Sequence, residues 1–385
     1  MKILHIVPSY KPAYIYGGPI ESVSRLCEGL VMAGHEVDVF TTTANGETEL
    51  DVEAGVPIDV DGVKVTYFKR ITKDPTHISP ALWKHLYANV KSYDIVNIQS
   101  WWNILVIVAA CICHFKRVKV VISPRGMLSE YIFESGSSKA KKMIHSMIGR
   151  SALSKSWFHA TAESEYEECR RIIKGWKGFI QPNIITLPDL PLVKQENEVF
   201  TLIFMSRVHP KKGIDILFHA LSRLSFDVIL KIAGSGEDDY ITELKELASK
   251  LGITEKIEWM GWVDRKDKFK ALMSSDLFVL VSLNENFANV VIESLHVGTP
   301  VLVSEEVALS AFVQRKDVGW VSSLDVVNVT EKITAARADK DKLERIRKNG
   351  RVIIEENFSA DKLVRNYVEE YQKVINSKSA NDNKN

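Results

Sequence analysis

The sequence predicts an α/β protein of two domains, each built on a mainly parallel sheet. Short apolar runs rich in β-branched side chains alternate with segments whose apolar residues recur at helical spacing, as in 276–304, DLFVLVSLNENFANVVIESLHVGTPVLVS. This alternation is typical of strands that are buried on both faces of a parallel sheet and connected by helices. A chain of 385 residues has room for two such domains.

The composition is that of a soluble globular protein. Hydrophobic residues make up 45% and charged residues 26% of the sequence, which is ordinary for this class. The 50 Lys and Arg residues and 49 Asp and Glu residues leave a net charge of +1, so no overall positive field favours nucleic acid. The longest apolar run, 104–113, is too short to cross a bilayer, and MKILHIVPSY at the N-terminus lacks the apolar core of a signal peptide. We expect a cytoplasmic protein, with peripheral binding to the inner face of the membrane left open.

Metal binding is not favoured by the cysteines or by the acidic motif DVDG at 59–62. The cysteines lack metal-ligand spacing, and we expect small buried residues with free thiols in a reducing compartment. Two close carboxylates in DVDG are able to hold a divalent cation on a diphosphate. Because Gly62 ends the motif and a strand is predicted at 63–68, we interpret it as a hairpin turn and expect no metal cofactor. The cysteines are Cys27, Cys111, Cys113 and Cys169.

A polar turn at 283–288 connects a predicted strand, 277–281, to a predicted helix capped by Asn289. Ligands of open parallel sheets bind at such strand ends. The helix N-terminus favours a phosphate, while the carboxylates of Glu285 and Glu293 suit hydroxyl donors. Phosphate together with a polyol indicates a sugar nucleotide. The alternative is that the two carboxylates form a solvated capping arrangement.

The first half of the chain begins with a βαβ unit. Strand 2–7 leads through a loop with Gly17 and Gly18 to a helix at 21–33 and a strand at 37–42. The glycines do not form the GxGxxG of dinucleotide-binding proteins, so NAD binding is weakly supported. An ordinary turn that needs positive φ is the alternative to a ligand-binding loop here.

Two later strands of this half also end in polar residues. The strand at 94–99 ends with Gln99 and is followed by Trp101, and the strand at 119–122 leads to Arg125. An Arg cannot act as a base, but it offers a fixed fork of donors to phosphate or sugar oxygens. We expect Arg125 to contact a ligand, the alternative being a surface Arg after a turn.

The second half repeats the pattern of a strand followed by a candidate binding residue. Strand 200–205 precedes Arg207 and Lys212, strand 227–233 precedes Gly234, and strand 256–260 precedes Trp262 and Val263. Each signal is weak alone. Their recurrence in sequence order, ending at Glu285, is far more specific than any single member.

These motifs resemble the retaining glycosyltransferases of GT-B fold, specifically glycosyltransferase family 4. The two Glu residues around Phe287, followed by GTP at 298–300, are similar to the donor site of that family. The pair Arg125-Gly126 resembles a subset that assembles bacterial polysaccharides such as O-antigen, capsule and lipopolysaccharide. The chain departs from the usual family pattern at Ala288, where the family has Gly, and at Arg125, where many members have His.

The resemblance implies two Rossmann-like domains facing across a cleft, with a C-terminal helix that crosses back to the first domain. It implies catalytic roles for Glu285, which faces the transferred sugar, and for Arg207 and Lys212, which reach the donor diphosphate. Implied acceptor or cleft contacts are Arg125, Gln99 and Trp101, and no residue is implied as a metal ligand. The implied donor-binding residues are Gly17, Gly18, Arg207, Lys212, Gly234, Trp262, Val263, Phe287, Ala288, Asn289 and Glu293, of which Glu293 takes the ribose and Trp262 and Val263 the base.

We expect an N-terminal acceptor-side domain at 1–185, a linker at 186–198, a nucleotide-sugar-binding domain at 199–357, a returning helix at 358–376 and a disordered tail at 377–385. A basic amphipathic segment at 137–158 suits contact with an anionic membrane, or else is a core-packing helix with a solvated face.

The expected function is metal-independent transfer of a hexosyl group, with retention, from a UDP- or GDP-linked donor to a lipid-linked carbohydrate acceptor in surface polysaccharide synthesis. The expected partners are this donor and a glycan acceptor, without nucleic acid. One alternative is another GT-B sugar-nucleotide enzyme, an epimerase or a phosphorylase. The other is a non-catalytic sugar-nucleotide-binding scaffold of a polysaccharide assembly complex.

Overall fold

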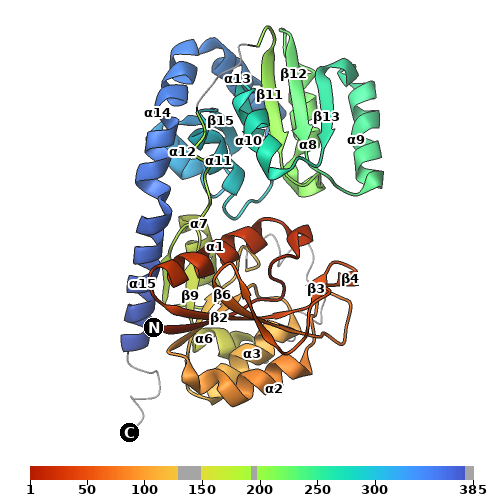
Figure 1. The fold of residues 1–385 in the computed structure, drawn as a ribbon. Helices are drawn as coiled ribbons and strands as arrows, with labels where there is room; N and C mark the ends of the chain where they lie inside the picture. The colour runs from red at the N-terminus through yellow and green to blue at the C-terminus, as the bar shows by residue number, and fades with distance from the viewer. Residues whose placement is uncertain (129–148, 192–196, 378–385) are drawn as a thin grey trace. The chain divides into compact units, whose positions relative to one another are not determined.

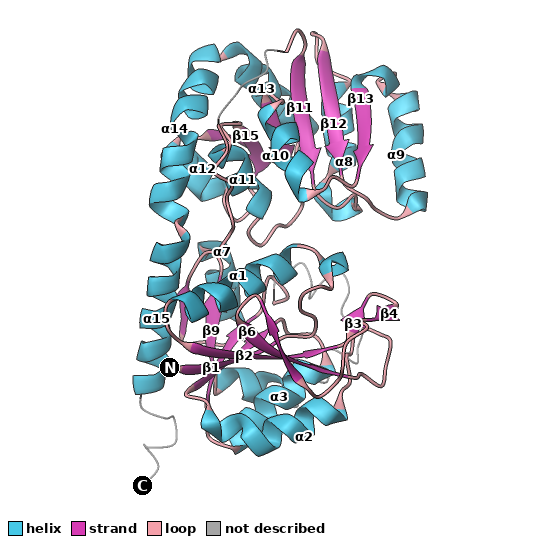
Figure 2. Cartoon of the chain, in the orientation of Figure 1, coloured by secondary structure: helices cyan, strands magenta, loops and turns pink. Residues whose placement is uncertain are grey.

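The computed structural model describes residues 1–128, 149–191 and 197–377. The chain divides into two compact units: unit 1 consists of Met1–Thr186 with Phe358–Asn385, and unit 2 is Leu187–Asn357. Each unit is a Rossmann-like structure in which helices cover a mainly parallel sheet (Figure 2). The predicted fold class is therefore confirmed.

In its described part, unit 1 contains an eight-stranded sheet of order β10-β9-β8-β7-β1-β2-β6-β5. All neighbours pair in parallel except β5, which runs antiparallel to β6. The strands are β1 (Lys2–Ile6), β2 (Glu36–Thr42), β5 (Pro57–Val60), β6 (Val63–Phe68), β7 (Ile95–Gln99), β8 (Lys119–Ser123), β9 (Trp157–Ala160) and β10 (Gly178–Ile180), and a separate small hairpin pairs β3 (Ala44–Asn45) with β4 (Thr48–Glu49).

Helices cover both faces of this sheet, and its side chains alternate between two cores. Along β1, Ile3 joins the core beneath α1 and α15, whereas Leu4 and Ile6 join the core beneath α2 and α3. Figure 1 shows α1 beside α15 and, on the other side of the sheet, α2 beside α3. The helices of unit 1 are α1 (Gly18–Met32), α2 (Pro80–Asn89), α3 (Ile104–Phe115), α6 (Arg150–Ser154), α7 (Glu163–Ile172) and α15 (Ala360–Asn376), with 3₁₀ turns η1 (Tyr14–Tyr16) and η2 (Val90–Ser92).

The last helix, α15, belongs to unit 1, as predicted. Its apolar face buries Leu363, Val364, Tyr367 and Tyr371 in the core shared with α1 and the sheet. A Cβ on Gly29 of α1 would lie 2.5 Å from Cγ2 of Val364. Glycine at this position therefore allows the two helices to pack closely.

Unit 2 contains a six-stranded, fully parallel sheet of order β13-β12-β11-β14-β15-β16. The strands are β11 (Phe200–Met205), β12 (Val228–Ala233), β13 (Ile257–Gly261), β14 (Leu277–Leu280), β15 (Val301–Ser304) and β16 (Gly319–Ser322). The helices are α8 (Ile214–Leu221), α9 (Asp238–Lys250), α10 (Arg265–Met273), α11 (Asn289–His296), α12 (Ser310–Lys316), α13 (Val326–Ala338) and α14 (Lys340–Phe358), with 3₁₀ turns η4 (Pro210–Lys212) and η5 (Thr254–Lys256).

The sequence 59–62 forms a hairpin turn, as predicted. Val60 pairs with Val63 across the antiparallel strands β5 and β6, and the two residues between them, Asp61 and Gly62, have φ of 54° and 83°. These angles suit a two-residue turn that matches the twist of the strands. Asp61 forms an ion pair with Lys11 at 2.7 Å.

Candidate donor site

The strand order of unit 2 changes direction between β11 and β14. From β11 the chain adds β12 and β13 on one side, and then returns to add β14, β15 and β16 on the other. Loops leaving two such neighbouring strands turn to opposite faces of the sheet, and open parallel sheets bind ligands in the crevice between those loops. The predicted residues Lys212 and Glu285 lie in these two loops.

Lys212 and Glu285 form an ion pair between the loops that follow β11 and β14. Nζ of Lys212 donates to Oε2 of Glu285, and their side chains are only 13% and 20% exposed. The loop backbones are also joined, since N–H of Leu283 and Oγ of Ser282 donate to the carbonyl oxygen of Lys211 at 2.8 and 2.9 Å. The cation and the carboxylate predicted to act on the donor are thus held next to each other by fixed backbone.

Two glycines make close approach possible between the loop after β11 and the loops after β14 and β12. Gly213, at φ 64°, follows Lys212, and a Cβ there would lie 2.2 Å from the carbonyl oxygen of Val281. At Gly234, at φ 154°, a Cβ would lie 1.9 Å from the carbonyl oxygen of Ser206. Neither position admits another residue without movement of the backbone, so both glycines are required to keep the strand-end loops in contact.

Arg207 supplies an exposed cation beside this pair of loops. Within the described part of the chain its guanidinium makes no hydrogen bond or ion pair, while the next residue, Val208, is fixed by an N–H bond to the carbonyl of Ser235 at 2.8 Å. Partial burial, reinforced by the charge of Arg207, lowers the pKa of His209. The loop therefore offers the positive charge of Arg207 on a fixed backbone.

The turn that carries Glu285 is tied to the loop after β15. N–H of Glu285 donates to the carbonyl of Glu306, and N–H of Ala308 donates to the carbonyl of Glu285, both at 3.0 Å. Phe287 is 3% exposed and anchors the turn in the core.

The entry into α11 differs from the expectation at one residue. The cap position is taken by Ala288, and Asn289 is the first helical residue, so the prediction that Asn289 caps the helix was wrong. Ala288 lies at φ 61° and ψ 70°, in the left-handed region. Alanine thus adopts the conformation that glycine favours, at a cost of roughly 1–2 kcal/mol, and the turn is formed despite the substitution.

The predicted ribose ligand, Glu293, is held by a lysine that sequence reasoning missed. Glu293 lies on α11 with a side chain only 4% exposed, and Nζ of Lys268, on α10, lies 2.5 Å from its Oε1. Lys268 is itself 20% exposed. Its place in the charged run 264–270 had the pattern of an ordinary solvated helix face.

Trp262 and Val263, the predicted base contacts, follow β13. Gly261 turns the chain at φ 66°, Trp262 is 74% exposed and Val263 is half-buried. The exposed indole offers a flat apolar face for stacking. The next residue, Asp264, starts α10 by accepting N–H of Asp267 at Oδ1 at 2.9 Å.

In unit 1, Arg125 is bound by neighbouring amides. Its Nε donates to Oε1 of Gln99 at 3.0 Å, and Nη1 donates to Oδ1 of Asn183. Its backbone is left-handed, at φ 57°, and N–H of Gly126 donates to the buried carboxylate of Glu165 at 2.6 Å. Arg125 is thus a half-buried, tightly held cation.

Behind Arg125 lies a buried chain of polar groups. Because Arg125 only donates, Oε1 of Gln99 must face it, and Nε2 of Gln99 then donates to Oδ1 of Asn97 at 2.6 Å. Nδ2 of Asn97 in turn donates to the hydroxyl oxygen of Tyr371 at 2.8 Å. Oγ of Ser123 also bonds Asn97. The charge of Arg125 therefore fixes the orientation of each amide as far as α15.

Two histidines of this region are buried and neutral. Burial, reinforced by the charge of Arg125, lowers the pKa values of His5 and His159 to about 3. His159 lies between Oγ of Ser123 and the hydroxyl of Tyr367, each 2.9 Å from a ring nitrogen. Neither histidine is exposed, so both contribute to the interior of unit 1 and not to a ligand surface.

The remaining predicted contacts of unit 1 have different surroundings. Trp101 is fully buried in the core beneath α3, and its indole has no exposed surface in this structure. Its contact with an acceptor or the cleft stays a prediction. Gln99 is 2% exposed, and its Oε1 accepts from Arg125. Gly17 and Gly18 are exposed at the start of α1, where Gly17 occupies the cap position at φ 74°.

Three further features bear on metal binding, redox chemistry and membrane contact. No group of three or more His, Cys, Asp or Glu side chains in 1–128, 149–191 and 197–377 is arranged to hold a metal ion. The four cysteines are free, three of them buried and Cys111 half-buried. None of the helices that the structure describes is both long and apolar enough to cross a bilayer. The predicted basic segment 137–158 lies largely outside the described residues, apart from its end at α6 and β9.

Both units match models of known domains. Residues 17–177 match the Glycosyl transferase 4-like domain, and residues 192–352 match Glycosyl transferases group 1. The chain combines these two glycosyltransferase domains. The group 1 domain carries the paired residues Lys212 and Glu285, and the 4-like domain carries Arg125.

The chain has a relative that matches along nearly its whole length. It is 27% identical, over 97% of its own chain and 98% of the other, to an uncharacterized glycosyltransferase of Methanocaldococcus jannaschii. It is 28% identical to the lipopolysaccharide core biosynthesis glycosyltransferase LpsE of Rhizobium meliloti, over 51% of this chain and 58% of LpsE. Among solved structures, Anabaena HepE in complex with UDP and glucose matches with a TM-score of 0.74 at 18% identity, over 97% of this chain and 100% of HepE. That structural likeness confirms the GT-B fold.

Proposed function

We propose that this glycosyltransferase transfers a hexosyl group from a UDP- or GDP-linked sugar to a hydroxyl of a carbohydrate acceptor, with retention of configuration and without a metal ion. The observation that carries the proposal is the pairing of Lys212 with Glu285 across the switch point of the group 1 sheet. A cation for phosphate and a carboxylate for sugar hydroxyls meet where parallel sheets bind ligands. HepE, which shares the fold, is solved with UDP and with UDP-glucose.

The cations have a direct role in this reaction. As the bond between sugar and diphosphate breaks, negative charge grows on the departing phosphate oxygens. Lys212 and the exposed Arg207 stabilise that charge from fixed loops, which lowers the barrier without solvent reorganisation. The departing phosphate itself takes the acceptor proton, so that bond formation and bond breaking occur on the same face of the sugar.

Glu285 has two partners during the reaction cycle. In this structure it binds Lys212. When a donor occupies the site, the diphosphate replaces the carboxylate as the partner of Lys212, and Glu285 accepts hydrogen bonds from hydroxyls of the transferred sugar. The pair therefore holds both side chains in place at the donor site.

The proposed acceptor is a lipid-linked glycan of a surface polysaccharide, and the proposed location is the cytoplasmic face of the membrane. Support comes from the relative LpsE, named for lipopolysaccharide core biosynthesis. Co-sedimentation of the protein with vesicles containing anionic lipid tests the membrane part. Absence of co-sedimentation at low salt contradicts it.

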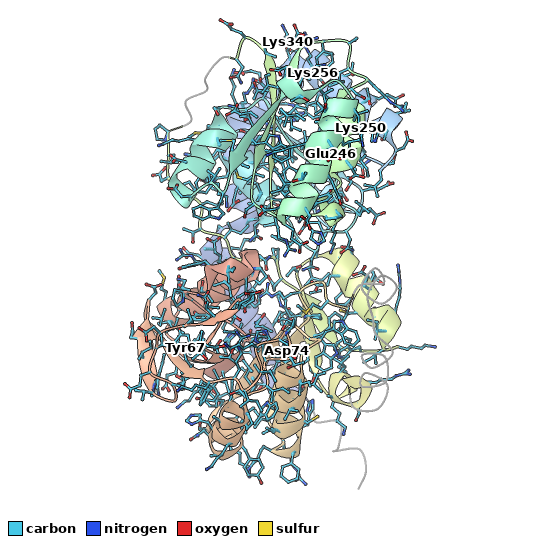
Figure 3. The ribbon with its side chains drawn as sticks, turned by 90° about the vertical axis from the view of Figure 1, so that its right-hand side faces the viewer. Tyr67, Asp74, Glu246, Lys250, Lys256 and Lys340 are labelled. Atoms are coloured by element: carbon cyan, nitrogen blue, oxygen red, sulfur yellow. The ribbon has the colours of Figure 1, made fainter. Side chains whose placement is uncertain are left out.

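The donor site is tested first by thermal denaturation with UDP, GDP, ADP, CMP, dTDP and their common sugar conjugates. Wild type is compared with Lys212→Ala and with a control, Lys250→Ala, on the exposed surface of α9 (Figure 3). A ligand at about one hundred times its Kd stabilises the folded state by about 2.7 kcal/mol. We expect one nucleotide to stabilise wild type and Lys250→Ala, and the effect to be mostly lost in Lys212→Ala.

Turnover assays with the selected donor separate transfer from the alternatives. Sugar epimerisation or sugar phosphate formation without an acceptor indicates one of the other GT-B reactions. Retention is read from the anomeric proton of the product by NMR, and metal independence from unchanged turnover in EDTA. Stabilisation by none of the nucleotides overturns the donor site and favours a scaffold role.

A further inference from the structure

The two carboxylates of the group 1 domain are each paired with a lysine of a neighbouring loop or helix. Glu285 binds Lys212, and Glu293 binds Lys268. The second pair is the more buried, since the Glu293 side chain is 4% exposed. Lys268 is not among the residues that the resemblance or the matches assign to the donor.

The surroundings of Glu293 explain why it needs a cation. Its side chain is 4% exposed on α11, a helix that also buries Val291, Ile292 and Leu295. Removal from water disfavours the charged form of a carboxylic acid, whereas a cation at hydrogen-bond distance favours it. Lys268, with Nζ 2.5 Å from Oε1, supplies such a cation.

Ionisation decides which ligand group the carboxylate accepts. A charged carboxylate is an acceptor only and has about four lone-pair sites, so one ammonium contact does not saturate it. It is able to accept both hydroxyls of a vicinal diol, as found in ribose. A neutral carboxylic acid would replace one acceptor position with a donor.

The backbone of Lys268 is fixed in the first turn of α10, close in sequence to the predicted base contact. Its N–H donates to the carbonyl of Asp264 at 2.9 Å in the first turn of α10, and Trp262 lies only six residues before it in the sequence. Helix α10 packs against α11, which bears Glu293. The predicted base contact, Trp262, and the lysine that binds Glu293 thus belong to one short segment that packs on α11.

We propose that Lys268 is a positioning residue that makes the donor site selective for ribonucleotides, by holding Glu293 in the charged form and orientation that accept the 2′- and 3′-hydroxyls of ribose. The inference rests on the proposed donor site in the group 1 domain. Lys268 acts through Glu293, while Arg207 and Lys212 supply the cations for the diphosphate.

The test is the ratio of the Kd values for a 2′-deoxynucleotide and for its ribonucleotide. Calorimetry is done with UDP, 2′-deoxy-UDP, GDP and 2′-deoxy-GDP on wild type, Lys268→Met, Lys268→Arg and Lys270→Met. Lys270 is a matched control because it lies on the same helix, 68% exposed, in a surface ion pair with Asp267. Melting temperatures of all variants show whether each is folded.

For the base that binds, we expect wild type and Lys270→Met to prefer the ribonucleotide by about tenfold to a hundredfold, the range for a hydrogen bond to a charged group. In Lys268→Met the ratio should fall below about three. Lys268→Arg keeps the charge and should retain part of the wild-type preference for the ribonucleotide. This comparison with wild type does not depend on whether Lys268→Met folds.

Four results overturn the inference. A wild-type ratio retained in Lys268→Met assigns Lys268 to stability alone, and equal weakening of both nucleotides assigns it to the phosphates. If wild type binds the nucleotides without preference for ribose, the ribose role of Glu293 fails while the donor site stands. Absence of any nucleotide binding instead rejects the proposed function itself, and this inference with it.

Discussion

The side-chain amide of Asn97, in the middle of a buried strand of unit 1, donates to the hydroxyl oxygen of Tyr371 on the last helix at 2.8 Å. The two residues are 274 positions apart in the sequence. Through Gln99 the same amide is connected to Arg125. The last helix is therefore joined to Arg125, which follows the carboxyl end of β8, by hydrogen bonds, and to the sheet by apolar packing.

Removal of the Tyr371 hydroxyl should destabilise unit 1. In Tyr371→Phe the Nδ2 group of Asn97 loses its buried acceptor, which costs about 1–3 kcal/mol of the free energy of unfolding. Urea denaturation measures the change. Tyr87→Phe, at a side chain that is 48% exposed, is the control and should change stability by less than about 0.5 kcal/mol. Equal effects of the two substitutions would contradict the role of the buried bond.

Substitution of Gly213 by alanine should destabilise unit 2 much more than the same substitution of Gly252. Gly213 and Gly252 both have positive φ, 64° and 67°, but a Cβ meets the carbonyl of Val281 only at Gly213, and open space at Gly252. Gly252→Ala should cost about 1–2 kcal/mol from the backbone alone. Gly213→Ala should cost clearly more and also weaken nucleotide binding, because Lys212 is adjacent. Urea denaturation measures the stability of both variants, and calorimetry measures their nucleotide affinity. Equal loss of stability in the two variants would show that a small backbone movement removes the clash at Gly213.

The turn at Ala288 should respond in opposite directions to smaller and larger residues. Ala288→Gly removes the strain of φ 61° but adds chain entropy to the unfolded state, so stability should rise by up to about 1 kcal/mol. Ala288→Val should lower stability by more than about 1 kcal/mol, because a β-branched side chain is disfavoured in the left-handed region. Thermal denaturation of the two variants checks the signs. A Val variant as stable as wild type would mean that the turn is easily rearranged.

Acid should destabilise unit 1 through its buried histidines. Burial, with the charge of Arg125, lowers the pKa of His5 from 6.5 to about 3. Between these values the unfolded chain binds a proton that the folded chain does not. Stability therefore rises with pH across this window and is lost as the pH falls from 6.5 toward 3, by up to about 1.4 kcal/mol per pH unit for each such group.

Substitution of His5 tests this linkage. His5→Gln should reduce the slope of unfolding free energy against pH between pH 4 and 6 by about 1.4 kcal/mol per unit. His219→Gln, at an exposed position of unit 2, serves as the control. An unchanged slope in His5→Gln would show that His5 becomes charged without unfolding.

Much of the fold was predictable because buried parallel strands and amphipathic helices have simple apolar patterns. The strand Phe200–Met205 has its predicted bounds, and the helix Ala360–Asn376 lies within the predicted range 358–376. Helix α1 begins at Gly18, earlier than predicted, because Gly17 and Pro19 provide the start. The helix Pro80–Asn89 was not predicted, since it buries only Leu82 and Leu86 and its apolar pattern is short.

The polar interior was not predictable by the same means. Asn97, Ser123 and His159 stand singly inside apolar strands, and their partners come from other strands and from α15. Local periodicity does not encode such long-range pairs. Trp101 was assigned to a ligand because it follows a strand end, although its indole fills the core. Lys268 resembled any surface lysine until the burial of Glu293 was known.

The assignment of α15 to unit 1 affects how the protein forms on the ribosome. Unit 2 is inserted between two segments of unit 1, and the apolar surface that Leu363, Tyr367 and Tyr371 cover stays open until residues 360–376 are translated. Residues 187–357 take roughly 9–34 seconds to translate at about 5–20 residues per second, and the core of unit 1 stays incomplete throughout that time. The domain that translation begins first is thus completed last, and its incomplete core is the part of the nascent chain most exposed to aggregation or chaperone binding.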